Sequence, residues 1–212
     1  MSPCMAPIES PGRAQRTALA ILAVTAIGLY LPALPGPLLL DDRYIIQPLL
    51  DAVTHGDSLW LYLFSESGPF GRPLAMASFI LNATFAGADL RYWKATSLAI
   101  HLLNGGLVYL TTVTLALLAA TPARAARALG LATAALWLLH PLHVSTVMYL
   151  SQRMTALSTL FALAAMLLYA RGRRAGADTR GGALQIVAAL LLATPLANCC
   201  RNLRNWPLRI GA

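Results

Sequence analysis

Two adjacent carboxylates, Asp41 and Asp42, follow directly after a long apolar segment, Thr17–Leu40. Acids in this position lie at the boundary between membrane and water, where charge is costly unless it is solvated or used. There they could act as a general base or hold a divalent cation, the one cofactor that the sequence suggests. The simpler alternative is that the pair is solvated at a helix end, or caps a helix that begins at Arg43. We interpret Asp41 and Asp42 as the candidate catalytic group.

Basic and imidazole side chains in later stretches could bind a phosphate. Arginine recognises phosphate with two parallel hydrogen bonds, and a neutral histidine can donate to an oxyanion or shuttle protons. The candidate phosphate ligands are Arg72, Arg153, His140 and His143. Alternatively, the arginines could anchor helices by reaching lipid headgroups, and the histidines could be packed or interfacial, with Pro141 marking a helix boundary.

His101 and Asn104 lie three residues apart near the start of a predicted span. This spacing places both side chains on one face of a helix. We expect them to have a structural role, in hydrogen bonds to a neighbouring helix.

The composition indicates an integral membrane protein. The 212 residues are 58% hydrophobic and 11% charged, whereas soluble domains carry about 25% charged residues. The net charge of +8 does not indicate nucleic-acid binding, because the basic residues cluster between apolar segments, as in cytoplasmic loops. The three cysteines give no disulfide framework, and no Cys/His spacing is typical of a zinc site.

The expected fold is all-α: a polytopic transmembrane helix bundle of about five spans with a large amphipathic first outer loop. Residues 1–16 are expected to form a cytoplasmic tail, and the spans are expected at about 17–40, 95–118, 128–139, 154–170 and 183–196. The loop 41–93 is predicted to lie in the interface as one or two amphipathic helices, with Tyr92 and Trp93 anchoring the second span. A cleaved signal peptide is the alternative for the first span, but no small-residue cleavage pattern precedes the acids.

Arginines predict the orientation of these spans. If the spans alternate in direction, one set of arginines lies entirely on the same side of the membrane. These are Arg13, Arg16, Arg124, Arg127, Arg171, Arg173, Arg174 and Arg180. The positive-inside rule makes that side, and the N-terminus, cytoplasmic. The acid-rich loop and the loop His140–Gln152 are then expected to share the non-cytoplasmic face.

The order of these motifs resembles the N-terminal part of the GT-C glycosyltransferases, in particular the bacterial relatives of the transmembrane-and-TPR O-mannosyltransferases. The resemblance covers about residues 17–195. It is carried by an apolar helix followed by Asp41-Asp42-Arg43-Tyr44, Gly71-Arg72-Pro73-Leu74, Asn82, His101-Leu102-Leu103-Asn104, His140-Pro141-Leu142-His143, Tyr149 and Gln152-Arg153-Met154.

The resemblance implies transfer of a sugar from a polyprenyl-phosphate donor to a protein or glycan acceptor, at the outer face of the bacterial inner membrane. It implies that Asp41 or Asp42 deprotonates the acceptor hydroxyl or holds a cation. It further implies that Arg72 and Arg153, with His140 or His143, bind the donor phosphate. The lipid bilayer is the other expected partner, and nucleic acid is not.

The chain also departs from the family pattern, whose members have more spans and commonly a C-terminal TPR region. Residues 198–212 are basic and aperiodic, which we interpret as a frameshifted or truncated end. We therefore expect residues 17–197 to form a partial GT-C-like membrane domain that is inactive by itself. The alternative is a non-enzymatic membrane component or transporter fragment in envelope polysaccharide or pilus biogenesis. Against a transporter, no acid falls inside a predicted span.

Overall fold

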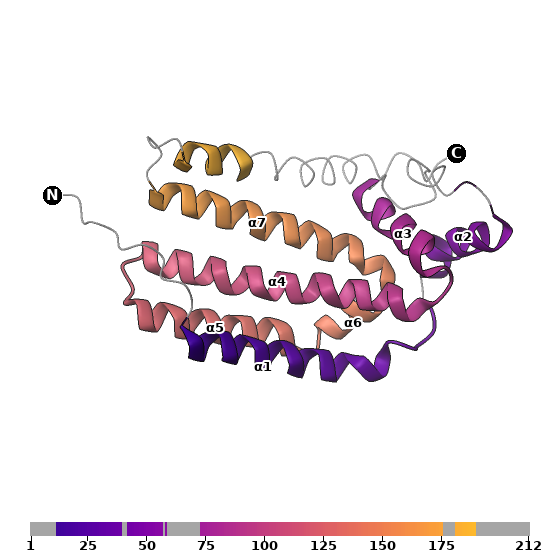
Figure 1. The fold of residues 1–212 in the computed structure, drawn as a ribbon, viewed down its shortest axis with the longest axis horizontal. Helices are drawn as coiled ribbons and strands as arrows, with labels where there is room; N and C mark the ends of the chain where they lie inside the picture. Colours follow the sequence, from indigo (N-terminus) through magenta and orange to yellow (C-terminus); the bar gives the residue numbers. More distant parts are fainter. Residues whose placement is uncertain (1–11, 40–41, 57, 59–72, 176–180, 190–212) are drawn as a thin grey trace, which may run out of the picture.

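The computed structural model describes residues 12–39, 42–56, 58, 73–175 and 181–189. These residues are almost all helical and contain no strand, so the all-α prediction is confirmed. Four helices lie lengthwise beside one another: α1 (Arg13–Tyr30), α4 (Leu90–Leu118), α5 (Ala123–Leu139) and α7 (Arg153–Ala175) (Figure 1). The longest of them, α4, packs against α5 on one side and α7 on the other.

Three helical segments are long and apolar enough to cross a membrane, namely Arg13–Ala33, Leu90–Leu118 and Leu150–Ala175. The chain is therefore described as a membrane protein, whereas the expected count of about five spans is not confirmed. α5 has 17 residues and is about 26 Å long at 1.5 Å per residue, slightly less than a hydrocarbon core of about 30 Å. Of the fifth expected span, 183–196, only residues 183–189 belong to the described part of the chain, where they are helical.

The first span ends earlier than the predicted range of 17–40. α1 is continued only by a 3-10 turn, η1 (Leu31–Ala33), before the chain leaves the helix. Pro32, Pro35 and Pro37 explain this end, because proline has no N–H to continue the helical hydrogen bonds and disfavours helix in the preceding residue.

The segment between the first two spans forms α2 (Asp42–His55) and α3 (Pro73–Ala86), which lie together at one end of the bundle (Figure 1). α2 is amphipathic: it buries Ile46 and Leu49 and exposes Tyr44. α3 instead is apolar on both its buried and its exposed sides. Its Phe79 is buried in the same apolar cluster as Ile46 and Leu49, and its Phe85 is exposed. That this segment lies in the membrane interface stays a prediction.

Trp93 does not anchor the second span at the interface as predicted. α4 begins three residues earlier, at Leu90, and the Trp93 ring is fully buried against Phe79. Its Nε1 donates to the Gly87 carbonyl at 3.0 Å. Gly87 has a φ of +56°, which favours glycine and ends α3 so that the chain can turn into α4.

Glycines let α4 and α5 approach closely. A Cβ on Gly105 would lie 2.6 Å from the Leu138 Cγ, and a Cβ on Gly130 would lie 2.6 Å from the Val113 Cγ2. Small residues at such positions are typical of helix pairs in membranes, where association depends on close packing.

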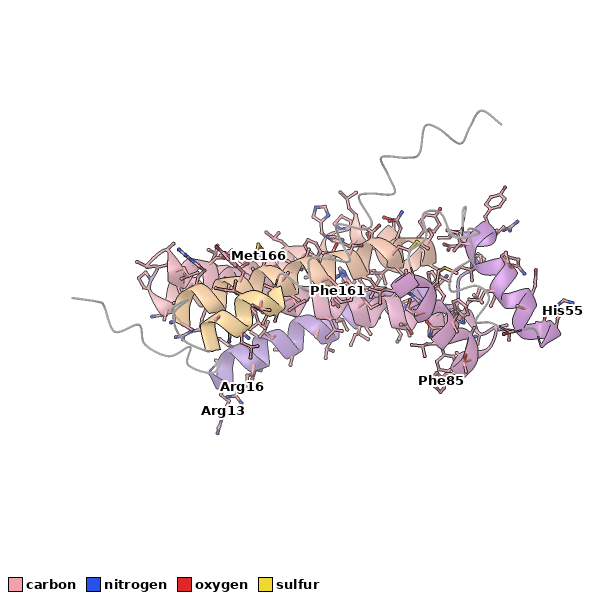
Figure 2. All side chains as sticks on the ribbon, turned by 90° about the horizontal axis from the view of Figure 1, so that it is seen from above. Arg13, Arg16, His55, Phe85, Phe161 and Met166 are labelled. Atoms are coloured by element: carbon pink, nitrogen blue, oxygen red, sulfur yellow. The ribbon has the colours of Figure 1, made fainter. Side chains whose placement is uncertain are left out.

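The charged residues are segregated along the bundle. All three acids that the structure describes, Asp42, Asp51 and Asp89, belong to α2 or the cap of α4 at one end. Apart from Arg43, Arg91 and Arg153, the described arginines lie near the helix ends at the opposite end, and Figure 2 shows Arg13 and Arg16 far from His55. This arrangement agrees with the prediction that the acidic and arginine-rich loops lie at opposite ends.

Candidate functional site

Asp42, the first residue of α2, is fully buried against the start of the last long helix. Its Oδ1 accepts a hydrogen bond from the Ser151 N–H at 2.7 Å, and its Oδ2 accepts one from the Leu150 N–H at 3.1 Å. Leu150 and Ser151 begin a 3-10 turn, η3 (Leu150–Gln152), that continues into α7. A carboxylate at a helix start is stabilised by unsatisfied N–H groups and by the helix dipole. Asp42 therefore caps a helix that lies more than a hundred residues away in the chain.

Arg153, at the start of α7, is also fully buried. Its Nη1 donates to the Asn82 Oδ1 at 2.6 Å, its Nη2 donates to the Trp93 carbonyl at 2.6 Å, and its Nε donates to the Ser97 Oγ at 3.2 Å. The guanidinium also lies 4.6 Å from the centre of the Phe79 ring. Arg153 thus joins α7 to both α3 and α4. A donor phosphate could bind this guanidinium only by replacing some of these contacts.

Lys94 completes the buried charged group and was not singled out from the sequence. Its Nζ donates to the carbonyls of Gly36 and Pro37 at 2.7 and 3.1 Å, and so ties the segment after α1 to α4. Asp42 interacts electrostatically with both Lys94 and Arg153. The sequence feature that could have indicated this role is the position of Lys94 at the start of a predicted span, where an ionisable residue needs a partner.

A second polar group lies where α4 and α5 meet α6 (His143–Met148). The ring centre of His143 lies 4.5 Å from that of Trp137, 5.2 Å from that of His101 and 6.3 Å from that of His140. His101 is buried, His143 is half-buried and His140 is exposed. Burial, and secondly the neighbouring His140, lowers the pKa of the His143 imidazole. His143 is therefore expected to be neutral near pH 7, with one N–H available for donation.

The structural role predicted for His101 and Asn104 is confirmed. The Nε2 of His101 lies 3.4 Å from the Leu138 carbonyl of α5, and the Nδ2 of Asn104 donates to the Ala156 carbonyl of α7 at 2.9 Å. The two side chains thus connect α4 to the helices on both of its sides.

Two of the predicted site residues, Asp41 and Arg72, lie outside the described residues. In the described part of the chain, no group of three or more His, Cys, Asp or Glu side chains could hold a metal ion. Cation binding by Asp41 together with Asp42 therefore stays a prediction.

The site was also compared with known proteins. No protein-family model, curated protein or solved structure matches this chain. The resemblance to the GT-C glycosyltransferases thus depends on the motifs alone.

The geometry separates two kinds of residue at this end of the bundle. Asp42, Lys94 and Arg153 form a buried charged group whose polar atoms contact protein atoms, so they fix how α2, α4 and α7 meet. His140 and His143 are at least partly accessible, and could contact a ligand that approaches along the membrane surface.

Proposed function

We propose that this chain is a glycosyltransferase-like membrane protein that transfers a sugar from a polyprenyl-phosphate donor to a protein or glycan acceptor. Support comes from one observation: Asp42, which follows the first span, is hydrogen-bonded to Leu150 and Ser151, which stand between the two predicted phosphate-binding stretches. Predicted site residues from distant parts of the sequence thus share one end of the bundle. That end is opposite the arginine-rich helix ends, so the positive-inside rule supports assigning it to the non-cytoplasmic face, with the N-terminus in the cytoplasm. The proposed membrane is the bacterial inner membrane, as the resemblance implies.

In this proposal Asp41 is the general base, since the Asp42 carboxylate already accepts hydrogen bonds from the backbone N–H groups of Leu39, Leu150 and Ser151. The acceptor hydroxyl loses its proton to Asp41 and attacks the anomeric carbon of the donor sugar. A new carbon–oxygen bond forms as the bond to the polyprenyl phosphate breaks. His143 and His140 donate hydrogen bonds to the departing phosphate, whose negative charge grows in the transition state. Asp42 acts as a positioning residue.

The second candidate is a non-enzymatic membrane component or transporter fragment in envelope polysaccharide or pilus biogenesis. One observation favours it: Asp42 and Arg153, two of the predicted site residues, are fully buried with protein partners. Under this interpretation both residues serve only to hold the bundle together.

A transfer assay on the purified chain in lipid nanodiscs distinguishes the candidates. Where the purified chain transfers the sugar from a radiolabelled polyprenyl-phosphate donor, the proposal predicts that Asp41→Asn abolishes this transfer, whereas the matched variant Asp51→Asn retains it. Asp51 is a suitable control because it is an exposed acid on α2, the helix that follows Asp41 in the sequence.

Binding of the donor is measured separately, because an incomplete enzyme would bind the donor without turning it over. The proposal predicts that His143→Gln weakens binding of the donor several-fold. If the unaltered chain neither transfers the sugar nor binds the polyprenyl-phosphate donor, the enzymatic proposal is wrong and the non-enzymatic candidate is favoured.

A further inference from the structure

The arginine-rich end of the bundle is a second surface with a distinct chemistry. Three helices contribute arginines there: α1 begins with Arg13 and Arg16, α5 begins near Arg124 and Arg127, and α7 finishes near Arg171, Arg173 and Arg174. Figure 1 shows these three ends on the same side of the molecule, opposite α2 and α3. We call this set of seven arginines the arginine surface.

No acidic residue in the described part of the chain lies at this end. Asp42, Asp51 and Asp89 all lie at the other end, where Asp89 caps α4 and Asp42 caps the start of η3. Glu9 and Asp178 belong to segments outside the described residues, and the arginines outnumber them even if both carboxylates were close. The arginine surface therefore carries more positive charge than these acids could balance.

These arginines lie at the ends of apolar helices, and this position indicates which kind of anion they bind. Arg171 and Arg173 follow directly after the apolar residues of a candidate span, Leu150–Ala175. Long arginine side chains at such positions place their apolar stems along the hydrocarbon and their guanidinium groups at the level of the headgroups. Arg13, Arg124 and Arg173 are exposed, and the Nε of Arg171 is buried without a hydrogen-bond acceptor.

We infer that the arginine surface binds the phosphate headgroups of anionic phospholipids in the leaflet that faces it. The planar guanidinium matches a phosphate with two parallel hydrogen bonds, and clusters of basic residues at the membrane surface attract anionic lipids. The expected ligand is the phosphodiester of a lipid headgroup, which the acyl chains hold at a fixed depth in the membrane. This fixed depth distinguishes a lipid from phosphate in solution. This inference does not depend on the proposed enzymatic function.

Native mass spectrometry of the full chain, released from micelles containing phosphatidylglycerol and phosphatidylcholine in equal amounts, tests the inference. The double variant Arg124→Gln/Arg173→Gln removes two exposed arginines from the arginine surface. The matched control, Arg43→Gln/Arg91→Gln, removes two exposed arginines from the opposite end, near Asp51 and Asp89. Circular dichroism of each variant verifies that its helical content is unchanged.

The unaltered chain is expected to prefer phosphatidylglycerol, and this preference should weaken as the salt concentration rises. Each arginine removed from the arginine surface is expected to lower the relative affinity by up to about fivefold, whereas the control double variant should retain most of the preference. Three results would overturn the inference: no preference in the unaltered chain, an equal loss in the control, or full competition by inorganic phosphate at the concentration of the lipid.

Discussion

Replacing Asp42 by asparagine is expected to destabilise the fold strongly, although the two side chains have nearly the same shape. The carboxylate is fully buried and accepts backbone hydrogen bonds from Leu150 and Ser151 at 3.1 and 2.7 Å. An asparagine has one acceptor oxygen, so its NH₂ group would face one of these two N–H donors. The substitution also removes the buried negative charge that interacts with Lys94 and Arg153.

The magnitude follows from these two losses, which overlap and are not simply added. A hydrogen bond to a charged group contributes about 1.5–3 kcal/mol, and removal of one partner from a buried charged group costs about 3–5 kcal/mol. We therefore expect Asp42→Asn to lower the free energy of unfolding by about 3–5 kcal/mol. For a chain of this length, that loss corresponds to a decrease in Tm of about 6–20 °C.

Thermal unfolding in detergent micelles, followed by circular dichroism, measures this effect. Asp51→Asn is the control, since Asp51 is exposed on the same helix and its substitution should change the free energy of unfolding by no more than about 0.5 kcal/mol. If Asp42→Asn is as stable as Asp51→Asn, the carboxylate does not hold the start of α7, and the buried charged group does not stabilise this end of the bundle.

Two further predictions concern packing and pH. Gly105→Ala should lower the free energy of unfolding by about 1–3 kcal/mol, because the new Cβ would collide with Leu138. Gly106→Ala should instead raise the free energy of unfolding by about 0.5–1 kcal/mol, because no atom lies within 4 Å of the new Cβ and alanine favours helix over glycine. Urea or SDS titration of both variants checks that the two effects have opposite signs. The pKa of His143 is lowered in the folded state, so the unfolded chain takes up the proton more readily as the pH falls. The contribution of neutral His143 to the free energy of unfolding is therefore fully present above about pH 6.5 and is lost as the pH falls through the folded-state pKa. Melting curves on both sides of that pH should show a smaller decrease for His143→Gln than for the unaltered chain, and an equal decrease would contradict the role of His143.

Much of the architecture could be predicted from the sequence because it depends on local patterns. Apolar stretches long enough to span a membrane predicted α1, α4 and α7, and the arginines near their ends predicted which helix ends lie together. The prolines at 32, 35 and 37 were visible as well, and the end of the first helix at Ala33 follows from them. The predicted range of 17–40 extends beyond Ala33 because residues 34–40 are apolar, although the prolines among them lack the N–H groups that a helix needs.

The pairing of distant residues could not be predicted in the same way. The sequence suggested Asp42 as a general base, as a cation ligand or as a cap of the helix that begins at Arg43, but its carboxylate caps a turn that begins at Leu150. Nothing in the local sequence around either residue specifies the other, because the contact depends on how α2 and α3 fold against α4. Trp93 illustrates the same limit: an aromatic residue at the start of a span is typical of an interface anchor, but here α3 covers it.

The buried charged group also suggests how this end of the bundle keeps one arrangement in an apolar environment. Apolar contacts between α2, α3 and α4 are not directional, and related packings would bury similar areas. The hydrogen bonds of Asp42 and Arg153 are directional, because each of these buried side chains would lose hydrogen bonds if α7 shifted along α4 by a single residue. Lys94 adds the same constraint on the segment after α1, through the carbonyls of Gly36 and Pro37. Three charged side chains therefore fix the relative positions of α1, α2, α4 and α7, so that the accessible histidines of the candidate site are presented on a rigid support.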